Sequence, residues 1–203
     1  MSAPAARPAL VLATRNPHKL EEVREILAPA RWQVLPLPDD VELPPEDGET
    51  FAENAAGKAR AAQAATGLPA IADDSGIEAT ALGGRPGVRS ARYAGEGASD
   101  EENLALLLEE VADADDRSVA YVCAMVYVSA AGEETLREAR CEGTLAERPR
   151  GEGGFGYDPA FVPVDFDDGR TMAELSPAEK HSISHRGRAV RAIAAAIEGG
   201  GGT

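Results

Sequence analysis

Two adjacent carboxylates and a hydroxyl follow a short apolar run, in the motif ADDSG at residues 72–76. Neighbouring carboxylates repel each other unless a cation or a shared proton lies between them. Magnesium suits such a pair, because Mg²⁺ prefers hard oxygen ligands and commonly uses one or two carboxylates plus substrate phosphates. The motif predicts metal chemistry at Asp73 and Asp74, next to the hydroxyl of Ser75. The alternative is an Asx-turn with solvated aspartates.

A buried strand is expected to hold this pair. Residues 68–72 are apolar, and Gly76 predicts a sharp turn just past the strand. A strand tip is rigid, so charges there can be aimed at a ligand. In open α/β sheets, ligands bind in the crevice at the carboxyl ends of the strands. We therefore expect the motif to face a ligand.

A second acidic group lies just upstream of this strand, and one of its members is expected to join the metal while the rest are solvated. Its members are Glu42, Glu46, Asp47, Glu49 and Glu53. Thr50 and Glu53 form a capping box that opens a helix, and Gly67 is expected to close it. Lys58 lies two turns along this helix, where it either meets a phosphate or extends to solvent.

Residues 14–19 (TRNPHK) connect an apolar strand, 9–13, to an amphipathic helix, 20–27. A helix N-terminus presents unpaired N–H groups and is a natural anion site. Thr14, Asn16 and Lys19 add a hydroxyl, an amide and an ammonium. The segment is not a P-loop, because the glycines are missing. The alternative is plain helix capping with a solvated Lys19.

Two further segments could bind a nucleoside. Residues 153–159 (GGFGYDP) place two aromatic residues between glycines, and Phe155 could offer a face for base stacking. Asp158 precedes a proline, which biases it towards an extended conformation. Residues 180–188 (KHSISHRGR) are the densest basic stretch and favour anion binding. For residues 153–159 the alternative is a hinge loop with its aromatic residues packed into the core. For residues 180–188 the alternatives are a solubilising face of an exposed helix and a structural His–carboxylate pair.

Helices alternate with strands early in the chain and a hairpin follows, which predicts an α/β fold with a mixed sheet. Further strands are expected at 32–37, 119–128, 135–141 and 143–147. Further helices are expected at 99–112 and from Ser176, the last ending near Glu198. Residues 38–49 are expected to form an exposed loop, and residues 77–97 an irregular glycine-rich segment.

Composition narrows the class of protein. The 203 residues fit one domain, with residues 1–8 and 199–203 expected to be flexible. A formal net charge of −15 argues against nucleic-acid or anionic-membrane partners. No apolar run has transmembrane length and no signal peptide is evident, so a cytoplasmic protein is expected. Cys123 and Cys141 match no metal-ligand spacing and are expected to be reduced core residues.

Taken together, these motifs resemble the inosine/xanthosine triphosphate pyrophosphatase family. The resemblance rests on TRNPHK, EDGETFAENAAGKA, LPAIADDSGIEATALGGRPGVRSARYAG, GGFGYDP and AELSPAEKHSISHRG, in the family's order from Leu10 to about Ile197. It implies a two-lobed α/β fold with a long central mixed β-sheet flanked by helices and a substrate cleft between lobes. It further implies a homodimer that uses Mg²⁺ to hydrolyse aberrant purine nucleoside triphosphates (ITP, dITP, XTP) to monophosphate and pyrophosphate.

The resemblance also implies roles for individual residues. Asp74 would be the general base and a metal ligand, with Glu46 as a second ligand and Asp73 in support. The triphosphate contacts would come from Thr14, Arg15, Asn16, Pro17, His18 and Lys19. Ser75 would touch substrate. The nucleoside pocket would be lined by Phe155, Gly156, Tyr157, Asp158, Lys180, His185 and Arg186.

The expected chemistry is phosphoryl transfer by positioning and electrostatics. Asp74 would orient a water for in-line attack, while Lys19 and Lys180 would stabilise developing charge. Donors from backbone amides, His185 or Arg186 would select a 6-oxo purine over adenine. Two alternatives are a Mg²⁺-dependent pyrophosphatase of modified pyrimidine nucleotides on a related fold and a nucleotide-binding protein without catalysis.

Overall fold

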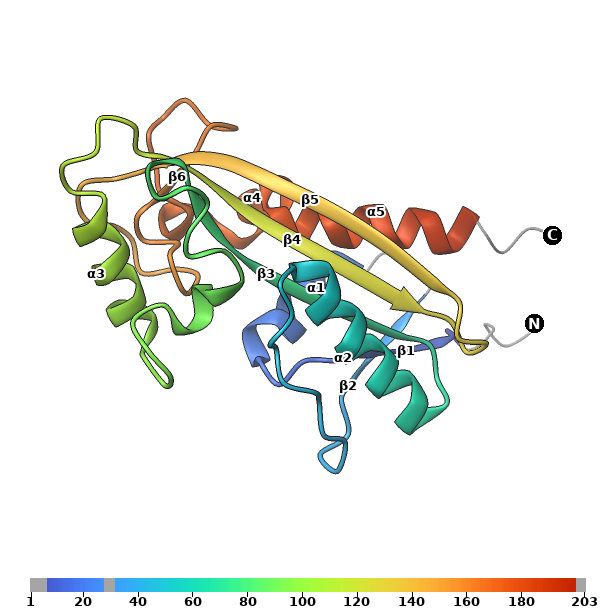
Figure 1. Cartoon of the computed structure of the whole chain (residues 1–203). Coiled ribbons are helices and arrows are strands. Elements are labelled where there is room, and N and C mark those ends of the chain that lie inside the picture. The colour runs from blue at the N-terminus through green and yellow to red at the C-terminus, as the bar shows by residue number, and fades with distance from the viewer. Residues whose placement is uncertain (1–6, 28–31, 200–203) are drawn as a thin grey trace. The chain divides into compact units, whose positions relative to one another are not determined.

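The structure is a computed structural model that describes residues 7–27 and 32–199 (Figure 1). Helices and strands alternate in the first part of the chain, and consecutive strands and then consecutive helices follow. The strands are β1 (Ala9–Leu12), β2 (Gln33–Pro36), β3 (Ala70–Ala79), β4 (Ser118–Val128), β5 (Glu134–Leu145) and β6 (Phe161–Pro163). The helices are α1 (Pro17–Leu27), α2 (Phe51–Thr66), α3 (Asp100–Glu110), α4 (Pro177–Ile183) and α5 (His185–Gly199). Short 3₁₀ turns occupy Thr80–Leu82, Gly87–Arg92 and Met172–Glu174.

One mixed sheet contains all six of these strands, in the order β2-β1-β3-β4-β5-β6. β1 runs parallel to both β2 and β3, with Val11 opposite Ala70. β6 is antiparallel to β5, with Gly143 opposite Pro163. The predicted α/β class with a mixed sheet is confirmed.

The chain divides into two compact units. Unit 1 comprises residues 1–74, 124–137 and 189–203, and unit 2 comprises residues 75–123 and 138–188. The predictions of a single two-lobed domain and of a substrate cleft between the lobes stay predictions.

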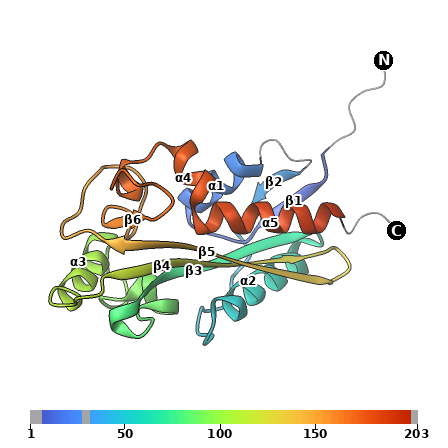
Figure 2. The ribbon, with the colours of Figure 1, turned by 90° about the horizontal axis from the view of Figure 1, so that it is seen from above.

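Alanines of α2 build much of the core of unit 1. Ala55, Ala59 and Ala62 are fully buried and pack with Val11 and Val126 of the sheet. Residues 189–199 of α5 lie on the face of the sheet opposite to α2 (Figure 2). Small side chains let the helix approach the strands closely, which fixes the polar residues of α2 against β3.

Unit 2 has its own core, built around the strand residues Ile77, Tyr121 and Cys141. Leu107 of α3 and Phe161 of β6 are also fully buried there. Cys123 and Cys141 are both buried free thiols, as predicted, and burial raises the pKa of Cys141 to about 12. No helix in the described ranges is long and apolar enough to cross a membrane.

Three helix starts predicted from capping residues are confirmed. Thr50, Ser99 and Ser176 each form the predicted capping box with a glutamate three residues later. Gly67 closes α2 in the left-handed conformation. Residues 38–49 form no helix or strand, as predicted.

The prediction of a turn at Gly76 is wrong, because β3 continues to Ala79. Ile77 and Ala79 are buried, with the half-buried Glu78 between them. The irregular segment predicted at 77–97 therefore begins with strand and then contains two 3₁₀ turns. ADDSG lies in the middle of a strand, not at its tip.

Two other boundaries also differ from the prediction. The strands expected at 135–141 and 143–147 are one strand, β5, which ends at Leu145. Gly143 lies inside it, where the ring of Phe161 leaves no room for a β-carbon. The C-terminal helical segment is broken at Ser184, which separates α4 from α5. The predicted flexible ends lie outside the described residues except for residues 7, 8 and 199, and Gly199 belongs to α5.

Candidate active site

Asp73 and Asp74 are both buried in β3, 1% and 6% exposed respectively. They share two cations. The charges of both carboxylates act on the Lys58 ammonium, and Lys19, which pairs with Asp73, also acts on Asp74.

Asn54 of α2 holds Asp74, a contact that sequence reasoning missed. Its Nδ2 donates to Asp74 Oδ2 at 2.8 Å, and its Oδ1 accepts from the Gly48 N–H at 2.8 Å. Asn54 thereby ties the acidic loop to the strand. Its position one helical turn before Lys58, on the same face of α2, was the available signal.

Lys58 is buried among the carboxylates. Its ammonium donates to Glu46 Oε1 and, at 2.7 Å, to the Asp73 carbonyl oxygen. Burial lowers the pKa of Lys58, but the charges of Asp73, Glu46 and Asp74 outweigh it and raise the pKa above its ordinary value. The ammonium is therefore protonated at neutral pH and compensates for the clustered negative charge.

The environment of Asp74 disfavours its charge. Burial raises the pKa of Asp74 above its ordinary value, and the Glu46 carboxylate adds to the rise. Lys58, the Asn54 amide and Lys19 oppose it. A rigidly held carboxylate with a raised pKa can act as a proton acceptor. An added cation would stabilise its charged form.

The segment at residues 14–19 forms the N-terminus of α1. Asn16 Oδ1 accepts the N–H groups of His18 and Lys19, at 2.9 and 3.3 Å, and Thr14 Oγ1 accepts that of Asn16 at 3.1 Å. Pro17 is the first helical residue. The capping alternative therefore describes this segment, but Lys19 is not solvated, since its ammonium lies 3.0 Å from Asp73 Oδ2.

Arg15 is occupied elsewhere. Its guanidinium donates to the carbonyl oxygens of Leu37, Pro38, Asp39 and Val41 at 2.7–3.3 Å. It also lies 3.7 Å from the Asp39 carboxylate. These contacts tie the loop after β2 to the segment before α1 and give Arg15 a role in holding that loop.

The side chains in unit 1 fit a magnesium ion that takes most of its ligands from substrate and water. Glu46 and Asp74 both interact with the Lys58 ammonium and supply hard oxygen donors. Within residues 7–27 and 32–199, no group of three His, Cys, Asp or Glu side chains is arranged to hold a metal by itself. A pair of carboxylates is sufficient for Mg²⁺ when phosphates complete the shell.

A second set of predicted residues gathers in unit 2 around Asp158. Its Oδ2 accepts from the Lys180 ammonium at 2.8 Å and from the Phe155 N–H at 3.0 Å. A β-carbon at Gly154 would collide with the same oxygen, and its φ of +72° also favours glycine. Asp158 is 3% exposed, and its carboxylate accepts hydrogen bonds that fix the shape of the loop at residues 153–159.

Phe155 lies beside two cations. The Lys180 Nζ is 4.8 Å and the Arg186 Cζ 5.6 Å from the centre of its ring. Arg186 also donates to Ser75 Oγ at 2.9 Å, which links the ADDSG motif to the basic segment. The structure thus brings together a half-buried aromatic ring, a hydroxyl and two cations.

The remaining predicted residues of unit 2 have clear positions. Tyr157 is buried and donates to the Ser90 carbonyl oxygen at 2.7 Å. The Gly156 N–H donates to Asp100 Oδ2 at 2.7 Å. His185 is buried and stacks on Tyr121. Sequence reasoning missed Asp100 and Tyr121, and nothing in the continuous apolar pattern of β4 distinguishes Tyr121 from a core residue.

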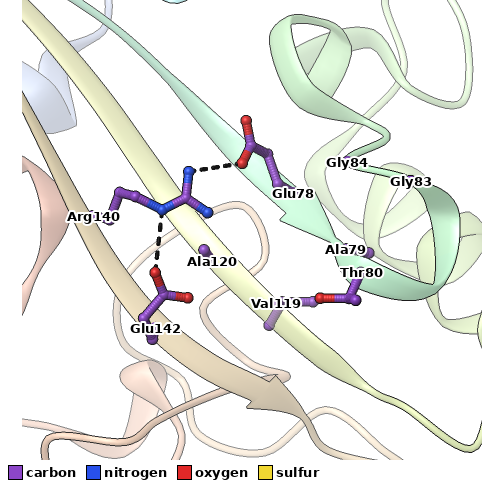
Figure 3. A pocket seen from close by; sticks show the side chains of 9 residues that line it. All are labelled: Glu78, Ala79, Thr80, Gly83, Gly84, Val119, Ala120, Arg140 and Glu142. Atoms are coloured by element: carbon purple, nitrogen blue, oxygen red, sulfur yellow. Dashed lines mark hydrogen bonds and ion pairs between the residues drawn. The ribbon is translucent and has the colours of Figure 1, made fainter.

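A pocket of about 280 Å³ in unit 2 contains none of the predicted site residues (Figure 3). It lies over Val119 and Ala120 of β4, beside the turn that follows β3. Arg140 pairs there with Glu78 at 2.8 Å and with Glu142 at 3.1 Å. These side chains are already engaged in ion pairs with one another, and the predicted site residues lie elsewhere, so the pocket is not the candidate site.

Comparisons with known proteins agree with the motif pattern. The family model described as the Ham1 family matches residues 10–196. A protein of Mycolicibacterium paratuberculosis named dITP/XTP pyrophosphatase is 51% identical over 196 residues, which cover 93% of this chain and 95% of the relative. A protein of Thermus thermophilus with the same name is 48% identical, over 94% of this chain and 92% of the relative.

Solved structures of similar proteins agree with the family match. A HAM1 protein from Coxiella burnetii superposes with a TM-score of 0.84 and 41% identity, covering 94% of this chain and 98% of that one. A nucleoside-triphosphatase, or dITP/XTP pyrophosphatase, from Mycobacterium abscessus gives a TM-score of 0.71 and 43% identity, covering 91% and 98%.

Proposed function

Because the chain belongs to the Ham1 family, we propose that it hydrolyses ITP, dITP and XTP to the nucleoside monophosphate and pyrophosphate. The observation that carries this proposal is the buried Asp74 carboxylate, held by Asn54 and surrounded by Lys58, Glu46 and Lys19. A polyphosphate brings both the negative charge that the lysines can bind and the oxygens that a shared cation needs.

We assign Glu46 and Asp74 as the residues that would hold Mg²⁺. When bound, the ion would neutralise phosphate charge and polarise the phosphorus centre. Asp73 keeps a supporting role, because its carboxylate pairs with Lys19. Lys19 and Lys58 are the cations assigned to the phosphates.

Asp74 is the proposed general base. It would accept a proton from water as the water oxygen bonds to phosphorus and the bond between the α- and β-phosphates breaks. Pyrophosphate leaves with the electron pair of that bond. The Asn54 hydrogen bond keeps the carboxylate in place for this transfer.

The residues of unit 2 are assigned to the nucleoside. Phe155 would stack on the base, with Ser75 beside it. Lys180, His185 and Arg186 would present donors to a 6-oxo purine, which adenine cannot satisfy with its 6-amino group. Tyr157, Gly156 and Asp158 support the loop through their contacts with Ser90, Asp100 and Lys180.

A substrate panel tests the function. Pyrophosphate release from dITP, ITP and XTP with Mg²⁺ should exceed release from dATP and dGTP by about 10²-fold or more. Excess chelator should abolish the release, because the carboxylates and phosphates then lack their shared cation. Faster turnover of modified pyrimidine triphosphates would favour the related pyrimidine pyrophosphatase instead. Tight nucleotide binding without pyrophosphate release would favour a non-catalytic protein.

Replacing Phe155 with Leu tests the stacking assignment. KM for dITP should rise about 5- to 100-fold, since stacking of a base on an aromatic ring contributes about 1–3 kcal/mol. kcat should change little, because the phosphate contacts come from other residues. Steady-state kinetics measure both constants. Leu136→Ala, on the exposed part of β5, is the matched control and should leave KM unchanged. An unchanged KM in Phe155→Leu would remove the residue from the base site.

Two further features are proposed from the family resemblance alone. We expect a homodimer in solution and action in the cytoplasm, where nucleotide pools are kept free of aberrant purines. Neither the homodimer nor the cytoplasmic location is argued from the contacts within units 1 and 2.

A further inference from the structure

Tyr121 lies in β4 at the centre of an aromatic stack. Its ring centre is 4.4 Å from that of Phe161 and 4.5 Å from that of His185, with interplanar angles of 21° and 16°. Two rings that are nearly parallel to Tyr121 at these distances cannot share one of its faces. Phe161 and His185 therefore cover opposite faces, and the plane of the His185 imidazole follows that of Tyr121.

The hydroxyl of Tyr121 makes a second connection. It donates to Asp158 Oδ1 at 3.1 Å, while Asp158 Oδ2 accepts from Lys180 and from the backbone of Phe155. Burial and the Asp158 charge hold the pKa of the Tyr121 phenol well above its ordinary value, so the hydroxyl stays protonated. One side chain thus orients the carboxylate that holds both Lys180 and the loop of Phe155.

We propose that Tyr121 is a positioning residue for purine recognition: its ring sets the plane of His185, and its hydroxyl fixes Asp158 and through it Lys180 and Phe155. The inference rests on the proposed function of these residues and adds a residue that touches no substrate. A three-ring stack inside a packed core suits this role, because buried side chains have little freedom to reorient.

Tyr121→Phe removes only the hydroxyl and keeps the stack. KM for dITP should rise about 5- to 20-fold while kcat stays within about twofold, because a hydrogen bond to a charged group is lost at a residue that only orients others. The affinity for inosine monophosphate, measured by calorimetry, should fall by the same factor. A residue that only supports the core would lower the unfolding temperature and leave both constants unchanged.

Tyr121→Leu removes the ring as well. The imidazole resonance of His185 should then shift in a ¹H–¹⁵N spectrum, because the ring current of its stacking partner is gone. The His185→Gln variant identifies that resonance among the three histidines of the chain. This readout requires no turnover.

Tyr93→Phe is the matched control in the same unit. The Tyr93 hydroxyl also donates to a carboxylate, that of Glu110, and accepts from Arg85, so its bonds are made to residues other than Asp158. KM, kcat and the histidine spectrum should stay unchanged in this variant.

The outcomes separate the two proposals. Absence of pyrophosphate release by the unmodified protein would overturn the proposed function, and the His185 resonance would still test the stack. An active protein whose Tyr121→Phe variant keeps the original KM and monophosphate affinity would overturn the inference. A stationary His185 resonance in a folded Tyr121→Leu variant would overturn it as well.

Discussion

Asp74→Asn should lower kcat/KM for dITP by about 10³- to 10⁴-fold. The change removes the proposed general base, which typically contributes 10²- to 10⁴-fold, and one of the two carboxylates assigned to Mg²⁺. The substitution preserves the shape of the side chain, and Asn54 can still bond to the new amide. Pyrophosphate release under saturating Mg²⁺ is the measurement.

The same substitution should leave the metal-free protein as stable as before or more stable. The pKa of Asp74 is raised in the folded protein. A carboxyl with a raised folded pKa favours folding while it is protonated, and this contribution is lost as the pH rises through that pKa. At pH 7 the ionised form therefore opposes folding, and a neutral amide removes this cost. Thermal unfolding in chelator measures the effect.

Loss of activity together with retained or increased stability is the signature of a functional carboxylate. Asp115→Asn, an exposed residue of unit 2, is the control and should change neither property. Near-normal turnover by a folded Asp74→Asn variant would show that another group activates the water.

Lys58→Met should destabilise the metal-free protein by about 3–5 kcal/mol. Removing one partner of a buried ionic group leaves uncompensated charge, and here Glu46 and Asp74 would lose their buried counter-ion. The methionine fills much the same volume, so the loss reports charge and not packing. Urea unfolding in chelator at pH 7 measures the free energy of unfolding.

Mg²⁺ should stabilise the Lys58→Met variant more than it stabilises the unmodified protein. Lys19 still acts on Asp74, but a divalent ion would replace the positive charge that Glu46 and Asp74 lose with the Lys58 ammonium. Binding to the folded state raises the free energy of unfolding in proportion to the logarithm of ligand concentration over Kd. Repeating the titration over a series of Mg²⁺ concentrations gives that dependence.

Arg60→Met is the matched control for Lys58. It lies two residues further along α2 and pairs with Glu134, but both side chains are substantially exposed. An exposed pair contributes about 0–1 kcal/mol, so this variant should unfold almost as the original does. A Lys58→Met variant as stable as Arg60→Met would mean that Lys58 does not compensate for the acidic residues.

Much of the helical structure could be predicted because its signals are local. A capping serine or threonine and the glutamate three residues later contact each other within one turn, so Thr50, Ser99 and Ser176 mark their helices without help from distant residues. The long apolar run of β4 similarly identifies a strand buried on both faces.

The turn expected at Gly76 was wrong because a glycine is compatible with several backbone conformations. Whether the chain turns there depends on partners far along the sequence: Ile77 bonds to Ser90 and packs into the core of unit 2. Asp73 and Asp74 lie within this continuous strand, where Asp73 pairs with Lys19 and Asp74 accepts a hydrogen bond from Asn54.

The sequence by itself determined the types of residue available for chemistry: paired aspartates, a glutamate loop, a glycine-bracketed phenylalanine and a basic segment. Each of these features consists of residue types at a fixed local spacing, so it can be recognised from a short stretch of the sequence. Tertiary structure alone decided that Asn54 holds Asp74, that Lys58 lies buried among carboxylates, and that Tyr121 stacks on His185. Those pairings join residues 12 to 64 positions apart, and only the packing of helices against strands brings such residues together.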